Sequence, residues 1–380
     1  MPAEALNNVV PPSESSVGLP GSADAAPGRP LATPLPRLAA QASEHEHGDL
    51  ADRLSELQAW LSGDLLGVEQ ALLQTSGPNL AQRAGWHILA AGGKRLRPLC
   101  TLLASRFGPR QDAVAHANAR NLAVAVELVH AATLLHDDVV DLADTRRGQA
   151  TARALHGNEV SIFAGDWLLV EALRRIVATG HPHLVTEALN TVDALILAEV
   201  DQGERAKHLA EDTDGYYRVV DGKTASLFRF ALRAGAVAGG CSAEATAALV
   251  QFGSELGMAF QLVDDVLDFE GTPAATGKSL LADLHEGKIT LPLALTLRQH
   301  PELRAAVAGV RSATLAGDAA DPQAVAAIAA AVRQSGALTT ARAVAAARLQ
   351  QAQTALDELP ESAQREALRA IADALATRRA

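Results

Sequence analysis

Two short segments of the chain place three aspartates in nearly the same pattern. Residues 134–141 read LLHDDVVD, and residues 261–268 read QLVDDVLD. In each segment the first and third aspartates are four residues apart, which puts them on one face of a helix. Carboxylates packed this closely repel one another and burial would raise their pKa values, so we expect a cation to lie among them. The residues are Asp137, Asp138, Asp141, Asp264, Asp265 and Asp268.

The ligand chemistry of these triplets favours magnesium. Carboxylate oxygens suit hard cations, and Mg²⁺ in particular combines one or two carboxylates with water molecules and a substrate phosphate. The alternative is that each triplet is a solvated helix end, because short motifs often match by chance. Two copies on otherwise apolar segments disfavour that alternative. A di-iron bundle is also disfavoured, because its Glu-x-x-His pair is found beside neither triplet.

A phosphate bound to Mg²⁺ would require basic side chains nearby, and the sequence contains them. The segment GGKRLRP (92–98) is a turn in which paired glycines let the backbone approach closely. DTRRG (144–148) follows the first triplet, and His130 lies two helical turns before Asp137 on the same face. Further candidates lie in DGKTASL, TGKS and EGKITLP. The candidate phosphate-binding residues are Lys94, Arg95, Arg97, His130, Arg146, Arg147, Lys223, Thr224, Lys278 and Lys288.

The elements that must position these residues have a helical pattern. From about residue 48 onward apolar residues recur at helix spacing, and no convincing alternating strand is found. Residues 121–141 are apolar almost all round, which is typical of a helix buried inside a bundle. We therefore predict an all-α fold with one large helical domain over 48–380. Residues 1–47 are rich in Pro, Ala and Ser and cannot bury enough apolar surface, so we predict a disordered tail.

Composition narrows the class of protein further. A hydrophobic fraction of 48% allows a sizeable core, and a net charge of −11 argues against non-specific nucleic-acid binding. The N-terminus has no signal-peptide pattern, and no uncharged apolar run is long enough for a membrane span. Cys100 and Cys241 lie among apolar neighbours without metal-site spacing, so we interpret them as core thiols of a reducing compartment. We expect a soluble, cytoplasmic protein.

Six segments resemble, in order and spacing, those of the trans-prenyl diphosphate synthases, the type I isoprenoid chain-elongating enzymes. They are GGKRLRP, ELVHAATLLHDDVVD, DTRRGQATA, GKTASLF, AFQLVDDVLD and TGKSLLADLHEGKITLPL. The resemblance runs from about residue 50 to the C-terminus. It implies a bundle of antiparallel helices around a central cavity, a homodimer, and Mg²⁺-dependent head-to-tail addition of isopentenyl diphosphate to an allylic diphosphate.

The resemblance also implies a role for each candidate residue. The two triplets would hold Mg²⁺ against the allylic diphosphate, and catalysis would depend on the first triplet with Lys223 and Lys278. No nucleophilic side chain is needed, because forming an allylic cation requires neutralising the departing diphosphate and excluding water. The allylic diphosphate would be bound by Arg146, Lys223, Thr224, Gln261 and Lys278. Isopentenyl diphosphate would be bound by Lys94, Arg97, His130 and Arg147.

Product length is predicted from the residues just before the first triplet. Ala132 and Thr133 are modest in size where short-chain relatives often carry aromatic residues. This indicates a medium or long product of the class used for quinone side chains, which would be passed to a membrane. Asp201 and Gly203 stand where long-chain relatives usually carry apolar residues, so a farnesyl or geranylgeranyl diphosphate synthase is the alternative.

Two rival hypotheses fit the sequence less well. A terpene cyclase shares the first motif, but its second motif usually mixes Asn, Ser or Thr with Glu, and it lacks the isopentenyl diphosphate site. A catalytically silent helical partner subunit would be expected to have lost aspartates, and none of the six is missing. Both hypotheses are therefore disfavoured relative to chain elongation.

Overall fold

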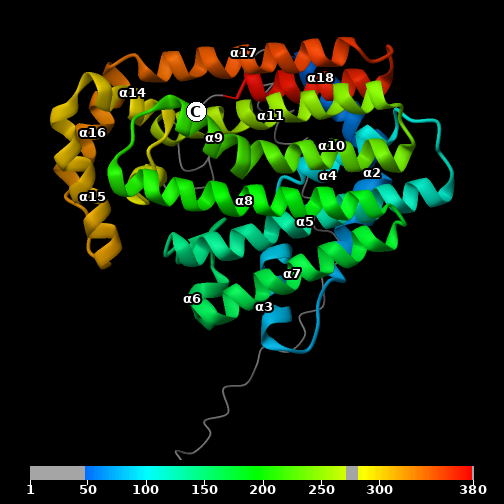
Figure 1. Cartoon of the computed structure of the whole chain (residues 1–380), viewed down its shortest axis with the longest axis horizontal. Helices are drawn as coiled ribbons and strands as arrows, with labels where there is room; N and C mark the ends of the chain where they lie inside the picture. The colour runs from blue at the N-terminus through cyan, green and yellow to red at the C-terminus, as the bar shows by residue number, and fades with distance from the viewer. Residues whose placement is uncertain (1–47, 271–280, 379–380) are drawn as a thin grey trace, which may run out of the picture. The chain divides into compact units, whose positions relative to one another are not determined.

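The computed structural model describes residues 48–270 and 281–378, and within them the fold is all-α, as the sequence predicts (Figure 1). The predicted tail over residues 1–47 lies outside the described residues, and so does Lys278. The first half of the chain forms α2 (Gly48–Leu73), α3 (Leu80–Ala90), α4 (Leu96–Ser105), α5 (Ala113–Val140), α6 (Ala152–His156), α7 (Asn158–Ala178) and α8 (Pro182–His208). The second half forms α9 (Thr213–Val220), the π-helical turn η1 (Asp221–Ala225), α10 (Ser226–Gly239), α11 (Ala243–Glu270), α13 (Ala282–His285), α14 (Leu291–Gln299), the 3₁₀ turn η2 (Pro301–Leu303), α15 (Arg304–Ala316), α16 (Pro322–Gln334), α17 (Ala337–Asp357) and α18 (Ala363–Ala376).

Helix α5 carries the first acidic triplet at its C-terminal end. Its N-cap is Asp112, whose carboxylate accepts hydrogen bonds from the backbone N–H groups of Val114 and Ala115. Every residue from 122 to 129 is buried, in agreement with the apolar pattern that predicts a buried helix here. Asp141 is the C-cap of α5, so the triplet lies on the last helical turn of a buried, well-anchored helix.

A short hairpin follows α5 and positions the two arginines of DTRRG. Strand β1 (Thr145–Arg146) pairs antiparallel with β2 (Gln149–Ala150), and this is the only β structure in the described ranges. Arg147 and Gly148 form the turn with positive φ angles of 54° and 75°, as a type I′ turn requires. Strands this short carry no alternating pattern, so the sequence analysis did not predict them.

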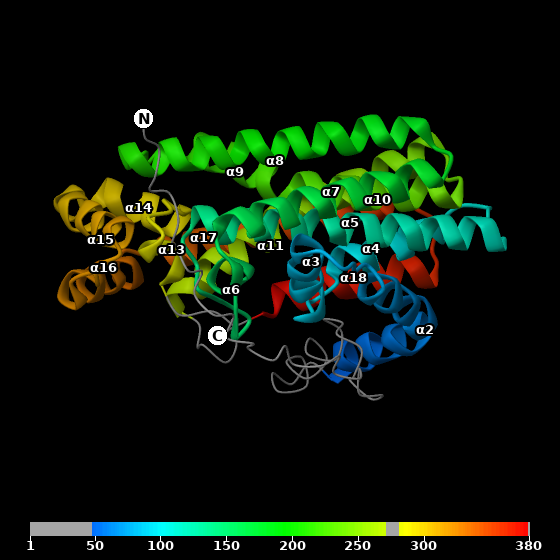
Figure 2. The same ribbon diagram turned by 90° about the horizontal axis from the view of Figure 1, so that it is seen from below.

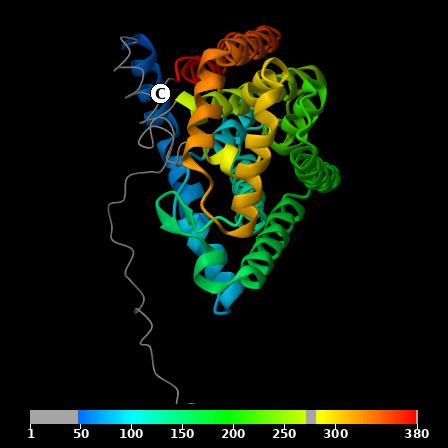
Figure 3. The same cartoon turned by 90° about the vertical axis from the view of Figure 1, so that its left-hand side faces the viewer.

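The long helices pack side by side in one bundle (Figures 1 and 2). Helix α5 packs against α4 and α7, α10 packs against α4 and α11, and α11 packs against α17. Helices α14, α15 and α16 lie together at one end of the bundle, on the left in Figure 1 and nearest the viewer in Figure 3. No helix in the described part of the chain is long and apolar enough to cross a membrane.

Glycines let α4 and α10 approach each other closely. A Cβ atom on Gly235 would lie 2.1 Å from the carbonyl oxygen of Thr101, and one on Gly239 would lie 2.1 Å from the carbonyl oxygen of Ser105. Both contacts are with backbone, which cannot move aside as a flexible side chain can. The spacing between α4 and α10 therefore depends on the absence of side chains at these two positions.

We predict that Gly235→Ala lowers the free energy of unfolding by about 1–3 kcal/mol, because the added methyl group must push α4 and α10 apart. The matched control is Gly309→Ala on α15, where a Cβ would meet nothing within 4 Å. That change should leave stability unchanged or raise it by about 1 kcal/mol, because alanine is the better helix former. Urea unfolding followed by circular dichroism measures both. A Gly235→Ala variant as stable as the control would contradict this account of the packing.

Candidate active site

One carboxylate of the first triplet is fully buried and lacks a partner for one oxygen. Asp138 has no exposed surface, and its Oδ1 accepts a hydrogen bond from Nε of Arg146 at 2.6 Å. Its Oδ2 is buried without a hydrogen-bond partner among the described residues. Burial raises the pKa of Asp138, while Arg146 lowers it. A buried carboxylate oxygen without a partner is costly, so this position fits a bound cation.

Asp137 lies between charges of both signs. Burial raises the pKa of its carboxyl group to about 6, and Glu199 adds to that rise. Lys223 and Lys288 act in the opposite direction. The third member, Asp141, accepts a hydrogen bond through Oδ2 from Nζ of Lys288 at 2.9 Å. The first triplet is thus surrounded by lysines from two distant segments of the chain.

The second triplet lies on α11, and each aspartate has a different kind of partner. Asp264 forms an ion pair with Arg378 near the C-terminus, with Nη1 and Oδ1 2.5 Å apart. The two carboxylate oxygens of Asp268 accept hydrogen bonds from the backbone N–H groups of Ala282 and Asp283, at 3.0 and 3.2 Å. Asp265 is 2% exposed, and burial raises its pKa to about 8.

A chain of side-chain hydrogen bonds runs from Asp265 to Thr224. The hydroxyl group of Tyr216 donates to Oδ2 of Asp265 at 2.6 Å, and Nε2 of Gln261 donates to Oδ1 at 2.8 Å. Oε1 of Gln261 in turn accepts from the hydroxyl group of Thr224 at 2.9 Å. Both oxygens of Asp265 therefore have protein donors. Its assignment as a metal ligand stays a prediction, and its visible contacts are those of a residue that orients Gln261 and Thr224.

Residues 281–288 contact both triplets. Their backbone N–H groups at Ala282 and Asp283 bond to Asp268, while Nζ of Lys288 bonds to Asp141 and to Glu286. Because one short segment reaches both triplets, the two acidic groups lie at the same end of the bundle. No three Asp, Glu, His or Cys side chains within 48–270 and 281–378 converge tightly enough to hold a metal ion by themselves. This pattern suits Mg²⁺, which takes part of its shell from water and phosphate.

The π-helical turn η1 carries Lys223 and Thr224, which lie near the first and the second triplet respectively. Such turns are rare and are frequently found at functional sites. Nζ of Lys223 lies 2.5 Å from Oε2 of Glu199 and donates to Oε1 of Gln202 at 2.7 Å. The positive charge of Lys223 also lowers the pKa of Asp137, which places it close to the first triplet.

The residues predicted to bind isopentenyl diphosphate share one neighbourhood. Burial lowers the pKa of the His130 imidazole well below its ordinary value, and the nearby positive charges of Arg97 and Arg147 lower it further. The guanidinium group of Arg147 lies about 3 Å from where a Cβ of Gly93 would be, next to Lys94. Arg97 stacks 4.5 Å from the ring centroid of Phe228, and its buried Nε has no hydrogen-bond partner in the described ranges. A cluster of cations with a neutral histidine is suited to an anionic ligand.

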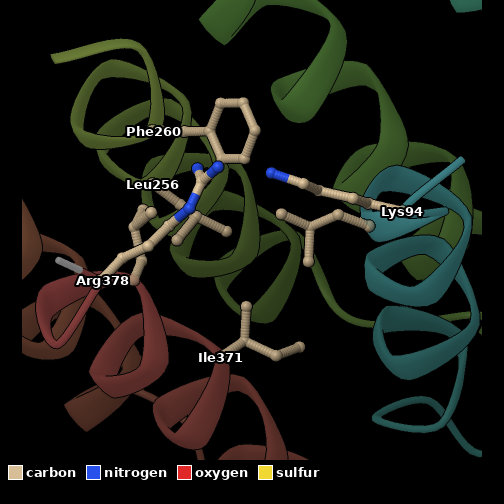
Figure 4. A pocket seen from close by; sticks show the side chains of 7 residues that line it. Lys94, Leu256, Phe260, Ile371 and Arg378 are labelled. Carbon is tan, nitrogen blue, oxygen red and sulfur yellow. The ribbon is translucent and has the colours of Figure 1, made fainter. Parts of the chain in front are cut away.

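A pocket lies beside this cluster (Figure 4). Lys94 reaches toward it from the turn before α4, with Nζ 5.7 Å from the ring centroid of Phe260 on α11. Arg378 faces it from the C-terminal end, and its guanidinium group lies 5.9 Å from the same ring. The remaining walls are apolar and come from three helices: Leu96, Leu256, Ile371 and Leu375. The pocket thus combines two cations with an apolar lining.

The residues predicted to set product length lie on α5 and α8. Ala132 has no exposed surface, and the hydroxyl group of Thr133 donates to the carbonyl oxygen of His130 at 2.8 Å. Asp201 is half-buried on α8, and nothing lies within 4 Å of a Cβ placed on Gly203. The role of Ala132 and Thr133 stays a prediction.

Several residues at this site were not assigned a role from sequence. Tyr216, Glu199 and Arg378 belong to no motif of the acidic or basic segments, and their contacts come from helices far apart in the chain. Tyr216 lies seven residues before Lys223, two helical turns, and that spacing is the one signal that could have identified it. Lys288 was noted as a basic candidate, and the structure places it against Asp141.

Comparison with known proteins gives a consistent result. The model of the polyprenyl synthetase family matches residues 78–332. The chain is 35% identical to heptaprenyl diphosphate synthase component 2 of Geobacillus stearothermophilus, over 84% of this chain and 97% of that protein. It is 37% identical to octaprenyl diphosphate synthase of Escherichia coli (strain K12), over 64% and 73% respectively. A polyprenyl synthase from Caulobacter crescentus CB15, complexed with calcium and isoprenyl diphosphate, superimposes with a TM-score of 0.78 at 34% identity, covering 87% of this chain and 98% of that one.

We predict that Asp137→Asn stabilises the metal-free protein at pH 8 by about 1–3 kcal/mol, because it removes a half-buried charge. The pKa of Asp137 is raised to about 6 in the folded protein. The folded state therefore binds this proton more tightly than the unfolded state, and the contribution of Asp137 to stability decreases as pH rises from 4 through 6. The advantage of the variant should be largest above pH 6 and vanish near pH 4.

Urea unfolding in a chelator at pH 4, 6 and 8 measures this difference. The matched control is Asp193→Asn, at an exposed position of α8, which should leave stability unchanged at each pH. An Asp137→Asn variant that is less stable than the wild type at pH 8 without metal would show that the ionised carboxylate does not destabilise the folded protein.

Proposed function

The chain belongs to the polyprenyl synthetase family of prenyltransferases, and from that premise we propose that it adds isopentenyl diphosphate head-to-tail to an allylic diphosphate to make a medium or long trans-polyprenyl diphosphate. The observation that carries this proposal is the pairing of two acidic triplets at one end of the bundle with a separate cluster of cations. One group suits a metal-bound diphosphate, and the other suits a second diphosphate. Two diphosphate sites are what condensation requires and what a cyclase lacks.

We assign Mg²⁺ to the acidic end. The unpartnered Oδ2 of Asp138 and the repulsion between carboxylates around Asp137 fit a divalent cation. When bound, the metal would neutralise the negative charge of the departing diphosphate. The residues that would hold it are Asp137, Asp138, Asp141, Asp264, Asp265 and Asp268.

We assign the protein's own cations to the two diphosphates. Arg146 and Lys223 would bind the allylic diphosphate with Thr224 and Gln261, and Lys278, outside the described residues, belongs to the same set. Lys94, Arg97, His130 and Arg147 would bind isopentenyl diphosphate. His130 is held neutral by burial and the nearby arginines, so it can donate one N–H to a phosphate oxygen without adding charge.

The reaction balances without a nucleophilic side chain. The carbon–oxygen bond of the allylic diphosphate breaks, and diphosphate leaves with the electron pair. The alkene of isopentenyl diphosphate then supplies the electrons of the new carbon–carbon bond, and the released diphosphate accepts the proton that is lost. The protein orients the two substrates and keeps water away from the cation. Apolar residues of α5 next to the triplet serve the second purpose.

We propose a product of medium or long chain length, destined for quinone side chains and passed to a membrane by a cytoplasmic enzyme. The small size of Ala132 and Thr133 supports this, because neither side chain would block a growing prenyl chain. The alternative is a short product of farnesyl or geranylgeranyl length. Asp201 and Gly203 on α8 favour the alternative, since neither a half-buried carboxylate nor a missing side chain makes a good apolar wall for a prenyl chain.

We predict that the purified protein with Mg²⁺ consumes isopentenyl diphosphate and releases products longer than geranylgeranyl diphosphate. Ala132→Phe should shorten the product, because an aromatic ring would occupy the space along α5 that the chain needs. Chromatography of the dephosphorylated products measures the chain length. The matched control is Ala125→Phe, at an equally buried position of α5 two turns earlier, which should alter stability but not shift a folded enzyme to shorter products. No turnover with any allylic primer would contradict chain elongation, and wild-type products limited to farnesyl or geranylgeranyl length would favour the alternative.

We further propose that two copies of the chain associate through α7 and α8. Phe163, Val170 and Val177 are exposed at seven-residue spacing on α7, and Leu189 and Ile196 have the same spacing on α8. Side chains seven residues apart lie on one helix face, so each helix presents an apolar stripe to solvent. A stripe of this kind is typical of an interface between subunits.

We predict that the protein is a dimer in light scattering and that Val170→Glu makes it monomeric, because the interface would bury a charge. The matched control is Val114→Glu, at an exposed position near the N-terminal end of α5 that belongs to neither stripe. That variant should remain dimeric. Activity that appears only after an unlike subunit is added would replace the homodimer with a hetero-oligomer.

A further inference from the structure

We infer that Arg95, held by Glu69 and Glu127, is a positioning residue that sets the site of isopentenyl diphosphate without touching the ligand. This inference rests on the proposed function, because it concerns the residues on either side of Arg95. Arg95 stands between Lys94 and Arg97 in the sequence, yet its side chain is 2% exposed. It therefore points into the protein rather than toward a ligand.

The guanidinium group of Arg95 joins three helices. Nε donates to Oε1 of Glu69 on α2 at 2.6 Å, and Nη1 donates to Oε1 of Glu127 on α5 at 2.7 Å. Nη2 donates to the carbonyl oxygen of Leu89 on α3 at 3.0 Å. The planar guanidinium group carries five N–H donors on three nitrogens in a fixed geometry, so it can satisfy these three partners at once. Arg95, the residue immediately before α4, is in this way bonded to α2, α3 and α5.

The backbone at Arg95 is in a conformation that needs such an anchor. Its φ angle is 48°, in the left-handed region, where side chains other than glycine are strained. Arg95 is also the N-cap of α4 and makes no side-chain capping bond there. The buried ion pairs offset this cost and hold the turn so that α4 begins immediately afterwards. Lys94 and Arg97, on either side, take their directions from that turn.

Glu127 links this turn to the rest of the cationic cluster. It lies three residues before His130 on α5, so the two side chains are on neighbouring turns of one face. Its negative charge also raises the pKa of Arg97 and of Arg147, in opposition to burial. One carboxylate thus anchors the turn, lies beside His130 and offsets repulsion among the arginines. The geometry of the whole cluster depends on it.

A contribution to stability alone would not explain why Arg95, Glu69 and Glu127 are charged. An apolar group of the same volume is often as stable as a buried ion pair, or more so. Apolar residues would fill the space between α2, α3 and α5, but they could not hold the backbone of Arg95 in one orientation. The charges of Arg95, Glu69 and Glu127 therefore serve to orient the turn. Their removal should weaken the binding of isopentenyl diphosphate more than that of the allylic substrate.

The experiment compares two variants in the full-length enzyme. Arg95→Lys keeps the charge but loses the fork, and the triple variant Arg95→Met, Glu69→Leu, Glu127→Leu removes all charges together. In both we expect KM for isopentenyl diphosphate to rise by about tenfold or more, with KM for the allylic substrate within about twofold of wild type. The kcat at saturating substrate should change by less than about threefold. A general loss of stability would not raise the KM for one substrate while leaving the other KM and kcat nearly unchanged.

The matched control is the pair Arg348 and Glu255, an ion pair between α17 and α11 in which Glu255 is also buried. Arg348→Met with Glu255→Leu should leave both KM values unchanged, since neither residue contacts the cationic cluster. If the triple variant does not fold, Arg95→Lys and the isosteric Glu127→Gln are measured in its place.

Calorimetric binding of isopentenyl diphosphate separates this inference from the proposed function, because it needs no turnover. A wild-type protein that binds the ligand about tenfold more tightly than the variants supports the positioning role, even if elongation is not observed. Equal affinities and equal KM values in folded variants would overturn it. The inference would also be overturned if the wild-type protein elongates normally and the variants lose affinity for both substrates equally.

Discussion

Asp138, Asp265 and Arg95 are ionisable groups with almost no exposed surface, and each is held by partners from other elements. Burying a charge is unfavourable unless a counter-charge or several hydrogen bonds lie at short range. The fold meets this requirement by bringing α2, α3, α5, α9, α11 and strand β1 to the buried groups. The acidic and basic parts of the site are therefore products of tertiary packing, since no single helix could stabilise them.

Tight packing is what makes such precise placement possible. Helices α4 and α10 meet through glycines, and α5 is lined with alanine and valine at its centre. Small side chains let backbones approach closely and leave few alternative rotamers, so the helices have little freedom to shift. A carboxylate on α5 and a lysine on η1 then keep a fixed separation. A looser core of larger, flexible side chains would allow the charges to relax toward solvent.

The sequence was sufficient for the all-α fold, the buried character of α5 and the two acidic triplets, because each depends on local spacing. It also identified Arg97, His130 and Arg147 as neighbours, through the resemblance to a known family. It did not reveal that the guanidinium group of Arg95 is paired with two acids, whereas that of Arg97 stacks on the ring of Phe228. That difference depends on one left-handed φ angle and on acids from two other helices. The contacts of Tyr216, Glu199 and Arg378 are likewise long-range, and the β1–β2 hairpin is too short for any periodic signal.

Residues 281–288 deliver backbone N–H groups to Asp268 and an ammonium group to Asp141, so a single stretch of chain touches both acidic triplets. Ordering this stretch against one triplet restricts its freedom at the other. A displacement of the segment from Asp141 would therefore also disturb the N–H groups that bond to Asp268. The two triplets are accordingly coupled through the backbone of one segment, so a substitution of Lys288 should affect the surroundings of both Asp141 and Asp268.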